Sequence, residues 1–254
     1  TRWVARRCYQ SLPAAVGVET PDSILMVHVW QCIFLGLTEV AVRGTMVSDA
    51  TEPPEVTEDE IQTVDDDHFN EDSVAIVTGG GSGIGRATAI ALAYNGLTVV
   101  ATDIDEDGLA ETVEKAAQCN AADNVETVTA DIVNEDEIAS MVEAAAELGD
   151  VRYVANIAGL QHISPIDEFP TEKFDLMHDV MLRGAFLVAK HTMPHIRATD
   201  DGVGAIGNMA SIHGHTATKD KVAYITAKFG LRGLTQAIAA EGEGTLRSFS
   251  ISTS

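Results

Sequence analysis

The sequence predicts an α/β fold, in which helices cover both faces of a doubly wound parallel sheet. Three observations predict it. A β-branched apolar run, SVAIVT (73–78), is typical of a strand that is buried on both faces. A glycine-rich turn follows this run, and a segment with helical apolar spacing, RATAIALAYNG (86–96), comes after the turn. Strands and helices then alternate along the chain, which is the order of a parallel α/β sheet.

The glycine turn GGGSGIG (79–85) indicates a dinucleotide-binding site of the Rossmann type, because it joins a strand to a helix. Glycines permit backbone angles and close approaches that other residues do not, and a helix N-terminus offers its N–H groups to a pyrophosphate. The alternative is a glycine-rich turn that binds no ligand. We expect cofactor contacts in this turn from Gly79, Ser82, Gly83, Ile84 and Gly85.

The next strand, LTVVATD (97–103), ends in a carboxylate that predicts NAD rather than NADP as the cofactor. Asp103 can accept hydrogen bonds from the adenosine ribose hydroxyls and would repel a 2′-phosphate. No basic side chain lies within the glycine turn to hold that phosphate, since residue 82 is a serine. Alternatively, Asp103 is a helix cap at the end of the strand.

The alternation continues with a strand at 124–131, an amphipathic helix at 134–148 and a strand at 151–159. Parallel sheets of this kind bind ligands at the carboxyl ends of their strands. We therefore expect further cofactor contacts from the residues at these ends: Asp131, Ile132, Asn156, Ala158 and Gly159. The three cysteines do not have the spacing of a zinc site, and no metal is expected.

The composition is strongly acidic, with 39 Asp and Glu against 16 Lys and Arg and a net charge of −23. The long-range field of such a chain repels nucleic acid and anionic membranes, so we expect neither as a partner. A dense carboxylate surface suits concentrated salt, which screens the self-repulsion. The composition therefore predicts a halophilic protein; the alternative is an ordinary acidic protein of the cytosol. The cysteines, an odd number without the spacing of a disulfide framework, favour a reducing, cytoplasmic location.

Three segments of different composition divide the chain. Residues 1–45 carry four arginines against three carboxylates, a net charge of +1, so residues 46–254 carry −24. We interpret 1–45 as an atypical extension outside the fold that lies upstream of a natural start at Met46. The alternative is a membrane anchor in its apolar run at 24–37. We interpret 46–72 as an acidic disordered linker and 73–254 as the NAD-binding domain.

Three motifs, in this order, resemble the short-chain dehydrogenase/reductase family. They are TGGGSGIG (78–85), NIAG (156–159), and Ser211 followed by Y-x-x-x-K (224–228). The resemblance covers residues 73–252. Within the family, two segments are similar to the 3-hydroxybutyrate dehydrogenases: residues 159–175 and 210–235.

The resemblance implies that Tyr224 is the catalytic acid/base, that Ser211 and Lys228 are its partners, and that Tyr224 and Lys228 also contact the cofactor. It further implies that the substrate carboxylate is bound by Gln161, His213 and Lys221. Residues four apart share a helix face, so Lys228 is expected beside Tyr224, where an ammonium favours the phenolate. By the same argument Lys221, three residues before Tyr224, is expected to point into the same cleft as a second cation.

Two features depart from the family pattern. Met181, in MLRGAF (181–186), occupies the position where the family usually carries an asparagine that supports a proton relay. The chain also stops at FSISTS (249–254), within the expected sixth strand. We therefore expect a sheet that is incomplete at its C-terminus, and a full-length protein that forms a homo-tetramer.

Together the motifs predict an NAD-dependent oxidoreductase that converts 3-hydroxybutyrate, or a similar small hydroxy acid, to the keto acid, here acetoacetate. One alternative is a short-chain dehydrogenase for a sugar or an acyl thioester, which would not use a second cation beside Tyr224. Another is a non-catalytic nucleotide-binding protein, which is suggested by Met181 and by where the chain stops. The intact set of Ser211, Tyr224 and Lys228 argues against this last alternative.

Overall fold

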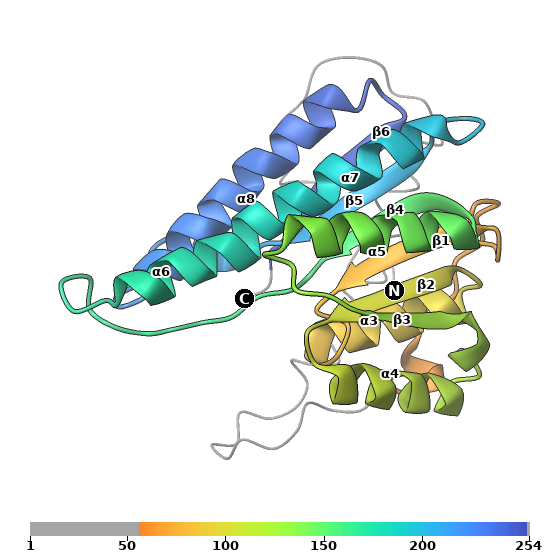
Figure 1. The fold of residues 1–254 in the computed structure, drawn as a ribbon, viewed down its shortest axis with the longest axis horizontal. Coiled ribbons are helices and arrows are strands. Elements are labelled where there is room, and N and C mark those ends of the chain that lie inside the picture. The colour runs from red at the N-terminus through yellow and green to blue at the C-terminus, as the bar shows by residue number, and fades with distance from the viewer. Residues whose placement is uncertain (1–55, 253–254) are drawn as a thin grey trace, which may run out of the picture.

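A computed structural model describes residues 56–252 of the chain (Figure 1). Its centre is a six-stranded parallel sheet in the order β3-β2-β1-β4-β5-β6. Along the chain the strands are β1 Ser73–Thr78, β2 Thr98–Asp103, β3 Val125–Thr129, β4 Asp150–Asn156, β5 Gly204–Met209 and β6 Leu246–Ile251. The winding direction changes between β1 and β4, which is where doubly wound sheets bind ligands. The predicted fold class is confirmed.

Helices cover both faces of the sheet. The helices are α3 Gly83–Tyr94, α4 Glu106–Gln118, α5 Glu135–Leu148, α6 Thr171–His178, α7 Ala185–Ala198 and α8 Val222–Glu241. One apolar core lies between the sheet and α3 and α4, and a second lies between the sheet and α5, α7 and α8. Helix α6 packs on the first turns of α8, and together with the loop before it extends away from the sheet (Figure 1).

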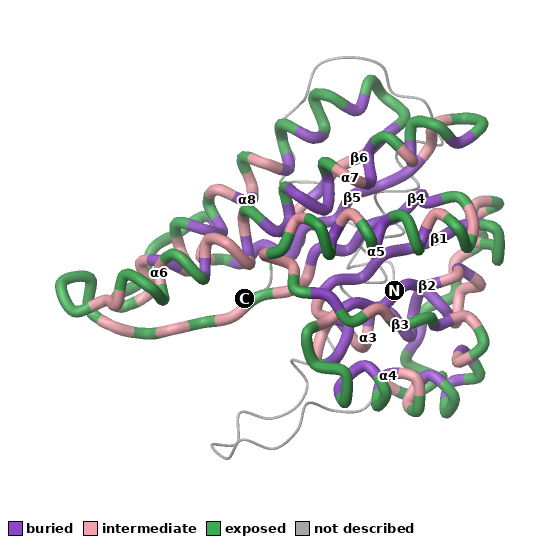
Figure 2. Tube along the Cα trace, in the orientation of Figure 1, coloured by how far each residue is buried: buried purple, intermediate pink, exposed green. Residues whose placement is uncertain are grey.

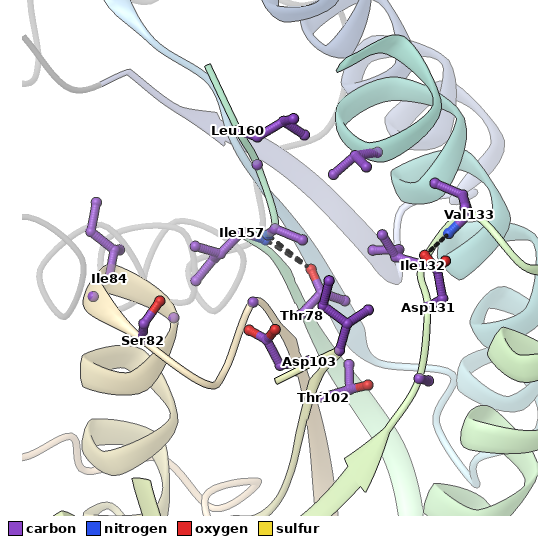
Figure 3. Close-up of a pocket in the computed structure, with 18 of the residues that line it drawn as sticks. Thr78, Ser82, Ile84, Thr102, Asp103, Asp131, Ile132, Val133, Ile157 and Leu160 are labelled. Carbon is purple, nitrogen blue, oxygen red and sulfur yellow. Dashed lines mark hydrogen bonds between the residues drawn. The ribbon is translucent and has the colours of Figure 1, made fainter. Parts of the chain in front are cut away.

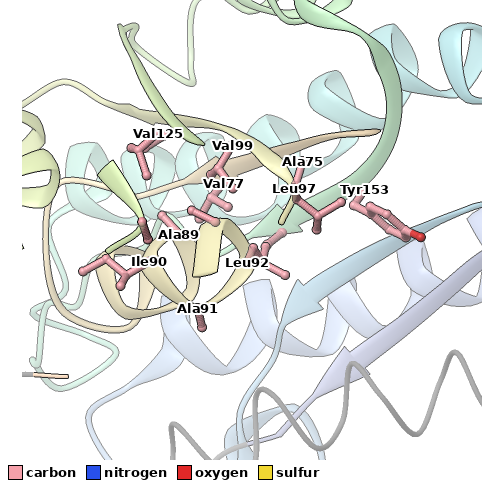
Figure 4. Packing of buried hydrophobic residues seen from close by; sticks show 14 of the residues in the cluster. Ala75, Val77, Ala89, Ile90, Ala91, Leu92, Leu97, Val99, Val125 and Tyr153 are labelled. Carbon is pink, nitrogen blue, oxygen red and sulfur yellow. The ribbon is translucent and has the colours of Figure 1, made fainter. Parts of the chain in front are cut away.

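β1 is the central strand, and all six of its residues are buried. Ala75 and Val77 enter the core on the α3 side, where Figure 4 shows them beside Leu92 and Val99. The alternate residues of β1 enter the core on the α5 side. Complete burial of one aliphatic side chain contributes about 1.5–3 kcal/mol. β1, β4 and β5 are the buried centre of the molecule, and the helices expose their outer faces (Figure 2).

The predicted strands agree with the structure, and so does the helix predicted at 134–148, which is α5; α3 and α4 differ from the predictions. β1 has its predicted bounds, and β2, β3 and β4 differ from theirs by a few residues at the ends. Helix α3 begins at Gly83, inside the glycine turn, rather than at residue 86. Helix α4 is absent from the predictions, because its sequence EDGLAETVEKAAQ is mostly polar and it buries little of its surface.

The acidic segment before β1 differs from the disordered linker that its composition predicts. In its described part, residues 56–72, Ile61 is buried, and Val64 and Phe69 pack against the core on the α3 side. The backbone N–H of Val64 donates to the Asn95 side chain at the end of α3, at 2.7 Å. A few apolar residues among many carboxylates are sufficient to hold the segment, and an average over its composition does not reveal them.

Several predictions concern residues outside the described range. These residues are the predicted extension 1–45, the first part of the acidic segment at 46–55, and the last two residues, 253 and 254. Within residues 56–252, no helix has both the length and the apolar character that crossing a bilayer requires.

Candidate active site

A cavity of about 550 Å³ opens at the carboxyl ends of β1, β2, β3 and β4 (Figure 3). Most of the residues predicted to contact a cofactor line it: Gly79, Ser82, Gly83, Ile84, Gly85, Asp103, Asp131, Ile132, Ala158 and Gly159. Three predicted contacts, Asn156, Tyr224 and Lys228, do not line it. The cavity also has walls that sequence reasoning missed: Thr78, Thr102, Ile104, Ala130, Val133, Ile157, Leu160, Leu176 and Val180.

The glycine turn forms a cradle at one end of this cavity. Gly79 and Gly83 have φ angles of +73° and +51°, in the left-handed region that favours glycine. A Cβ on Gly85 would collide with the carbonyl oxygen of Gly79, so the turn can close on α3 only with glycine there. A Cβ on Gly83 would meet nothing within 4 Å, so the space at the N-terminus of α3 is open. Open space beside the N–H groups and the positive end of a helix fits a pyrophosphate.

Helix α4 also holds this turn. The Thr112 hydroxyl donates to the carbonyl of Gly80 at 2.7 Å, and the Arg86 guanidinium donates to the carbonyl of Gly81. Arg86 is itself paired with Glu111 on α4, at 2.7 Å. The arginine that follows the glycine motif is therefore engaged by the turn and by α4.

Asp103 joins the end of β2 to the glycine turn. One of its carboxylate oxygens accepts from the N–H of Gly81, and the other from the N–H of Asp105, each at 3.1 Å. Because Asp105 is the N-terminal cap residue of α4, Asp103 stabilises the start of that helix as well as lining the cavity. A carboxylate has about four acceptor positions, so two remain for ribose hydroxyls. Both interpretations of Asp103 from the sequence are therefore compatible with its position.

Buried polar contacts connect the strands under the cavity. The Thr78 hydroxyl accepts from the N–H groups of Ile157 and Ala158, at 3.0 and 3.2 Å, and so ties β1 to the turn after β4. Asn156, which was predicted as a cofactor contact, is buried below the cavity and donates to the Asn208 side chain at 2.9 Å. The structure therefore places Asn156 as a link between β4 and β5.

Ser211, Tyr224 and Lys228 lie in one group between the end of β5 and α8. Lys228 Nζ is 5.4 Å from the centre of the Tyr224 ring, as the spacing of four residues predicts. His213 meets the Tyr224 ring edge-on, with 5.8 Å between ring centres. Its Nδ1 is 3.4 Å from Ser211 Oγ. The predicted catalytic residues are thus neighbours, and His213 lies among them.

An apolar cluster joins this group to the cavity. Tyr224 packs in one cluster with Leu160 and Val180, and both of these residues line the cavity. Met181, at the position of the expected asparagine, is buried in the same cluster. A Cβ on Gly159 would lie 3.6 Å from Met181 Cγ. The cavity and the group around Tyr224 are therefore two parts of one site.

Lys228 is a buried cation. It is 3% exposed, and burial lowers its pKa to about 8. Its ammonium donates to the carbonyl of Met209 at the end of β5. A buried ammonium is costly to keep charged, and such perturbed groups gather at functional sites. This observation agrees with the role that the resemblance implies.

Of the three predicted substrate contacts, Lys221 is the one that is placed differently from expectation. Lys221 precedes α8 and has φ −125° and ψ 33°, so the argument from helical spacing does not apply to it. Gln161 is exposed on the loop after β4. Of this trio, His213 is the residue with contacts to Ser211 and Tyr224.

A π-helical turn, Asp179–Gly184, connects α6 to α7 and forms part of the cavity wall through Val180. Turns of this kind are often found at functional sites. A Cβ on Gly184 would lie 2.8 Å from Ile132 Cγ1, so a glycine is needed for this close approach. Sequence reasoning missed the part of the cavity wall that α6 and this turn form. In the sequence, Gly184 is the local feature that could have indicated a close approach there.

Comparison with known proteins agrees with this geometry. The family described as short chain dehydrogenase matches residues 73–248. The uncharacterized oxidoreductase YxjF of Bacillus subtilis is 36% identical over 169 residues, 66% of this chain and 65% of that protein. A D-beta-hydroxybutyrate dehydrogenase of Cupriavidus necator is 34% identical over 173 residues, 66% and 64% of the two chains. A D-threitol dehydrogenase of Mycolicibacterium smegmatis is 34% identical over 192 residues, 72% and 69% of the two chains.

Among solved structures, a short chain dehydrogenase from Mycobacterium smegmatis has a TM-score of 0.68 and 28% identity. The match covers 75% of this chain and 80% of that one. The chain spans slightly less than two thirds of the Bacillus subtilis and Cupriavidus necator proteins, at 65% and 64% of their lengths.

Proposed function

The chain belongs to the short-chain dehydrogenase family, and from this premise we propose that it oxidises 3-hydroxybutyrate, or a similar small hydroxy acid, with NAD. The observation that carries the proposal is the buried cluster around Met177 and Met181, against which Tyr224 packs together with Leu160 and Val180, two residues that line the cavity. The hydroxyl group of a substrate bound beside Tyr224 would lie at one end of the cavity, and the glycine cradle at the other part of the cavity fits a dinucleotide. The likeness to a D-beta-hydroxybutyrate dehydrogenase supports this choice of substrate.

In the proposed reaction, Tyr224 acts as the general base and takes the proton of the substrate hydroxyl. The Lys228 ammonium, 5.4 Å from the ring centre, favours the phenolate that this step requires. The Ser211 hydroxyl donates to the reacting oxygen, and it orients that oxygen together with Tyr224. The glycine turn would hold the pyrophosphate of NAD, and Asp103 the adenosine ribose. NAD, when bound, supplies the hydride acceptor.

We predict that NAD binds more tightly than NADP, because a 2′-phosphate would meet the Asp103 carboxylate. Arg86, the basic residue after the glycine motif, is already paired with Glu111 at 2.7 Å. Fluorescence titration with both cofactors measures the difference, and Asp103→Ala is expected to reduce it. Asp105→Ala is a matched control, because Asp105 lies two residues further and does not line the cavity. Equal or tighter binding of NADP to the unaltered chain would contradict the assignment.

For the substrate, we predict that Lys221 is the cation that meets the carboxylate. Breaking a desolvated charge pair costs about 2–5 kcal/mol, so Lys221→Ala is expected to lower kcat/KM for 3-hydroxybutyrate by roughly tens to thousands of fold. Lys219→Ala removes an exposed lysine from the same loop and serves as the control. Activity on an uncharged secondary alcohol should change little in either variant. Equal losses on both substrates would mean that Lys221 stabilises the fold instead.

A sugar alcohol is the second candidate substrate. The likeness to a D-threitol dehydrogenase favours it, as does the position of Lys221 before α8 rather than on the helix face of Tyr224. A neutral polyol needs no cation beside Tyr224. Efficient turnover of D-threitol, unchanged by Lys221→Ala, would select this candidate over the hydroxy acid.

A further inference from the structure

The imidazole of His213 lies between two hydroxyl groups. Its Nδ1 is 3.4 Å from Ser211 Oγ, and its Nε2 is 3.0 Å from the hydroxyl oxygen of Thr218. The ring is half-buried and meets the edge of the Tyr224 ring, with 77° between the ring planes. Both nitrogens therefore have a protein partner, and neither is directed at open space alone.

The hydrogen bonds of Ser211 depend on which nitrogen of the His213 ring carries the proton. Ser211 Oγ already accepts from the backbone N–H of His213, at 3.2 Å. A serine hydroxyl has two acceptor positions and one hydrogen. If Nδ1 of His213 carries the proton, it fills the second acceptor position, and the hydroxyl hydrogen stays free. If Nδ1 is unprotonated, the hydroxyl hydrogen is used within the protein, since it donates to the ring.

We propose that His213 is a positioning residue that holds the Ser211 hydroxyl ready to donate to the reacting oxygen. In this arrangement Nδ1–H donates to Ser211 Oγ, and the Thr218 hydroxyl donates to Nε2. The hydrogen bonds then run in one direction, from Thr218 through His213 and Ser211 to the substrate. The proposal rests on the proposed function, which places the reacting oxygen beside Ser211. It leaves Gln161 and Lys221 as the residues for the substrate carboxylate.

Nitrogen NMR of the isotope-labelled chain tests the tautomer without cofactor or substrate. The two ring nitrogens of a neutral histidine have distinct shifts, and the His213 signals are identified by their loss in His213→Gln. We expect a protonated Nδ1 and an unprotonated Nε2. Thr218→Val removes the donor to Nε2 and should shift the population towards the other tautomer. Thr216→Val, at an exposed neighbouring threonine, should leave it unchanged. A dominant Nε2–H form in the unaltered chain would overturn the proposal.

Kinetics separate positioning from substrate binding. One neutral hydrogen bond contributes about 0.5–1.5 kcal/mol, so Thr218→Val should lower kcat by about two- to twelvefold, while KM for the hydroxy acid stays within about twofold. Thr218→Ser keeps the hydroxyl and should retain the activity. A raised KM with unchanged kcat would mean that this pair binds the carboxylate, and would also overturn the proposal. If the unaltered chain turns over no hydroxy acid, the proposed function fails, while the NMR result still decides the tautomer.

Discussion

Lys228 shows how a single residue of the site opposes the stability of the fold. Its ammonium is buried and donates a hydrogen bond to the carbonyl oxygen of Met209. Burial lowers its pKa from 10.5 to about 8, so the unfolded chain binds the proton more tightly than the folded one. The protein is therefore destabilised by this charge at all pH values below about 8. The cost lessens as the pH rises towards 10.5, where the unfolded chain also loses the proton.

We predict that Lys228→Met stabilises the fold and removes activity. The shift in pKa corresponds to about 3 kcal/mol, and the lost hydrogen bond to Met209 offsets about 1 kcal/mol of it, which leaves a gain of about 2 kcal/mol at pH 7. The gain should vanish as the pH rises from about 8 to 10.5. Urea unfolding at several pH values measures it, with Lys219→Met, an exposed lysine, as the control. A variant that is less stable than the unaltered chain at pH 7 would contradict this account.

At the scale of elements, the glycine turn depends on its contacts with both helices that follow it. α3 begins inside the turn at Gly83, and its Arg86 donates to the carbonyl of Gly81. α4 holds the carbonyl of Gly80 through Thr112 and pairs with Arg86 through Glu111. The cradle is therefore shaped by two helices rather than by the glycine motif alone. This explains why α4, which has little apolar surface of its own, is bound firmly to the site.

We predict opposite effects for two Gly→Ala substitutions. Gly85→Ala places a Cβ against the Gly79 carbonyl, and such overpacking costs about 1–3 kcal/mol or more. NAD binding should weaken with it, because the cradle must shift. Gly233→Ala on α8 meets nothing within 4 Å and should stabilise the chain by about 0.5–1 kcal/mol. Thermal unfolding and NAD titration of both variants measure these effects. Unchanged stability and binding in Gly85→Ala would show that the turn is less tightly packed than the structure indicates.

At the scale of the whole molecule, charge acts both for and against the fold. The net charge of −23 repels the compact state, yet local polar contacts help to hold the acidic segment in place. His68 of this segment lies 2.8 Å from Asp201, which is also paired with Arg152 at 2.7 Å. Burial acts to raise the pKa of Asp201, but hydrogen bonds from Arg152, the Val203 backbone and His68 hold it well below its usual range. Attraction is therefore local, while repulsion is spread over the surface.

We predict that stability rises with salt concentration. The Debye length falls from about 10 Å at 0.1 M to about 3 Å at 1 M, so salt removes the long-range repulsion between carboxylates. The short, partly buried pairs around Asp201 are screened much less. Circular dichroism melts across a potassium chloride series measure the effect, with most of the gain expected below about 1 M. The same melting temperature at low and molar salt would exclude the halophilic interpretation.

The sequence by itself determined the order of the elements, the glycine turn and the pairing of Tyr224 with Lys228. Each of these follows from residues close together in the chain, where spacing sets which side chains share a face. The position of Lys221 shows the limit of this reasoning, because spacing gives a shared face only where a helix has already begun.

Only the tertiary structure decided how distant segments meet. It placed Tyr224 on the same buried cluster as Leu160 and Val180, which line the cavity, and it placed Asn156 under the cavity rather than in its wall. It also ordered residues 56–72 on the core, against their composition. Such contacts depend on which surfaces pack together after the sheet has formed. A residue pattern within one segment does not indicate which distant segments will pack against it.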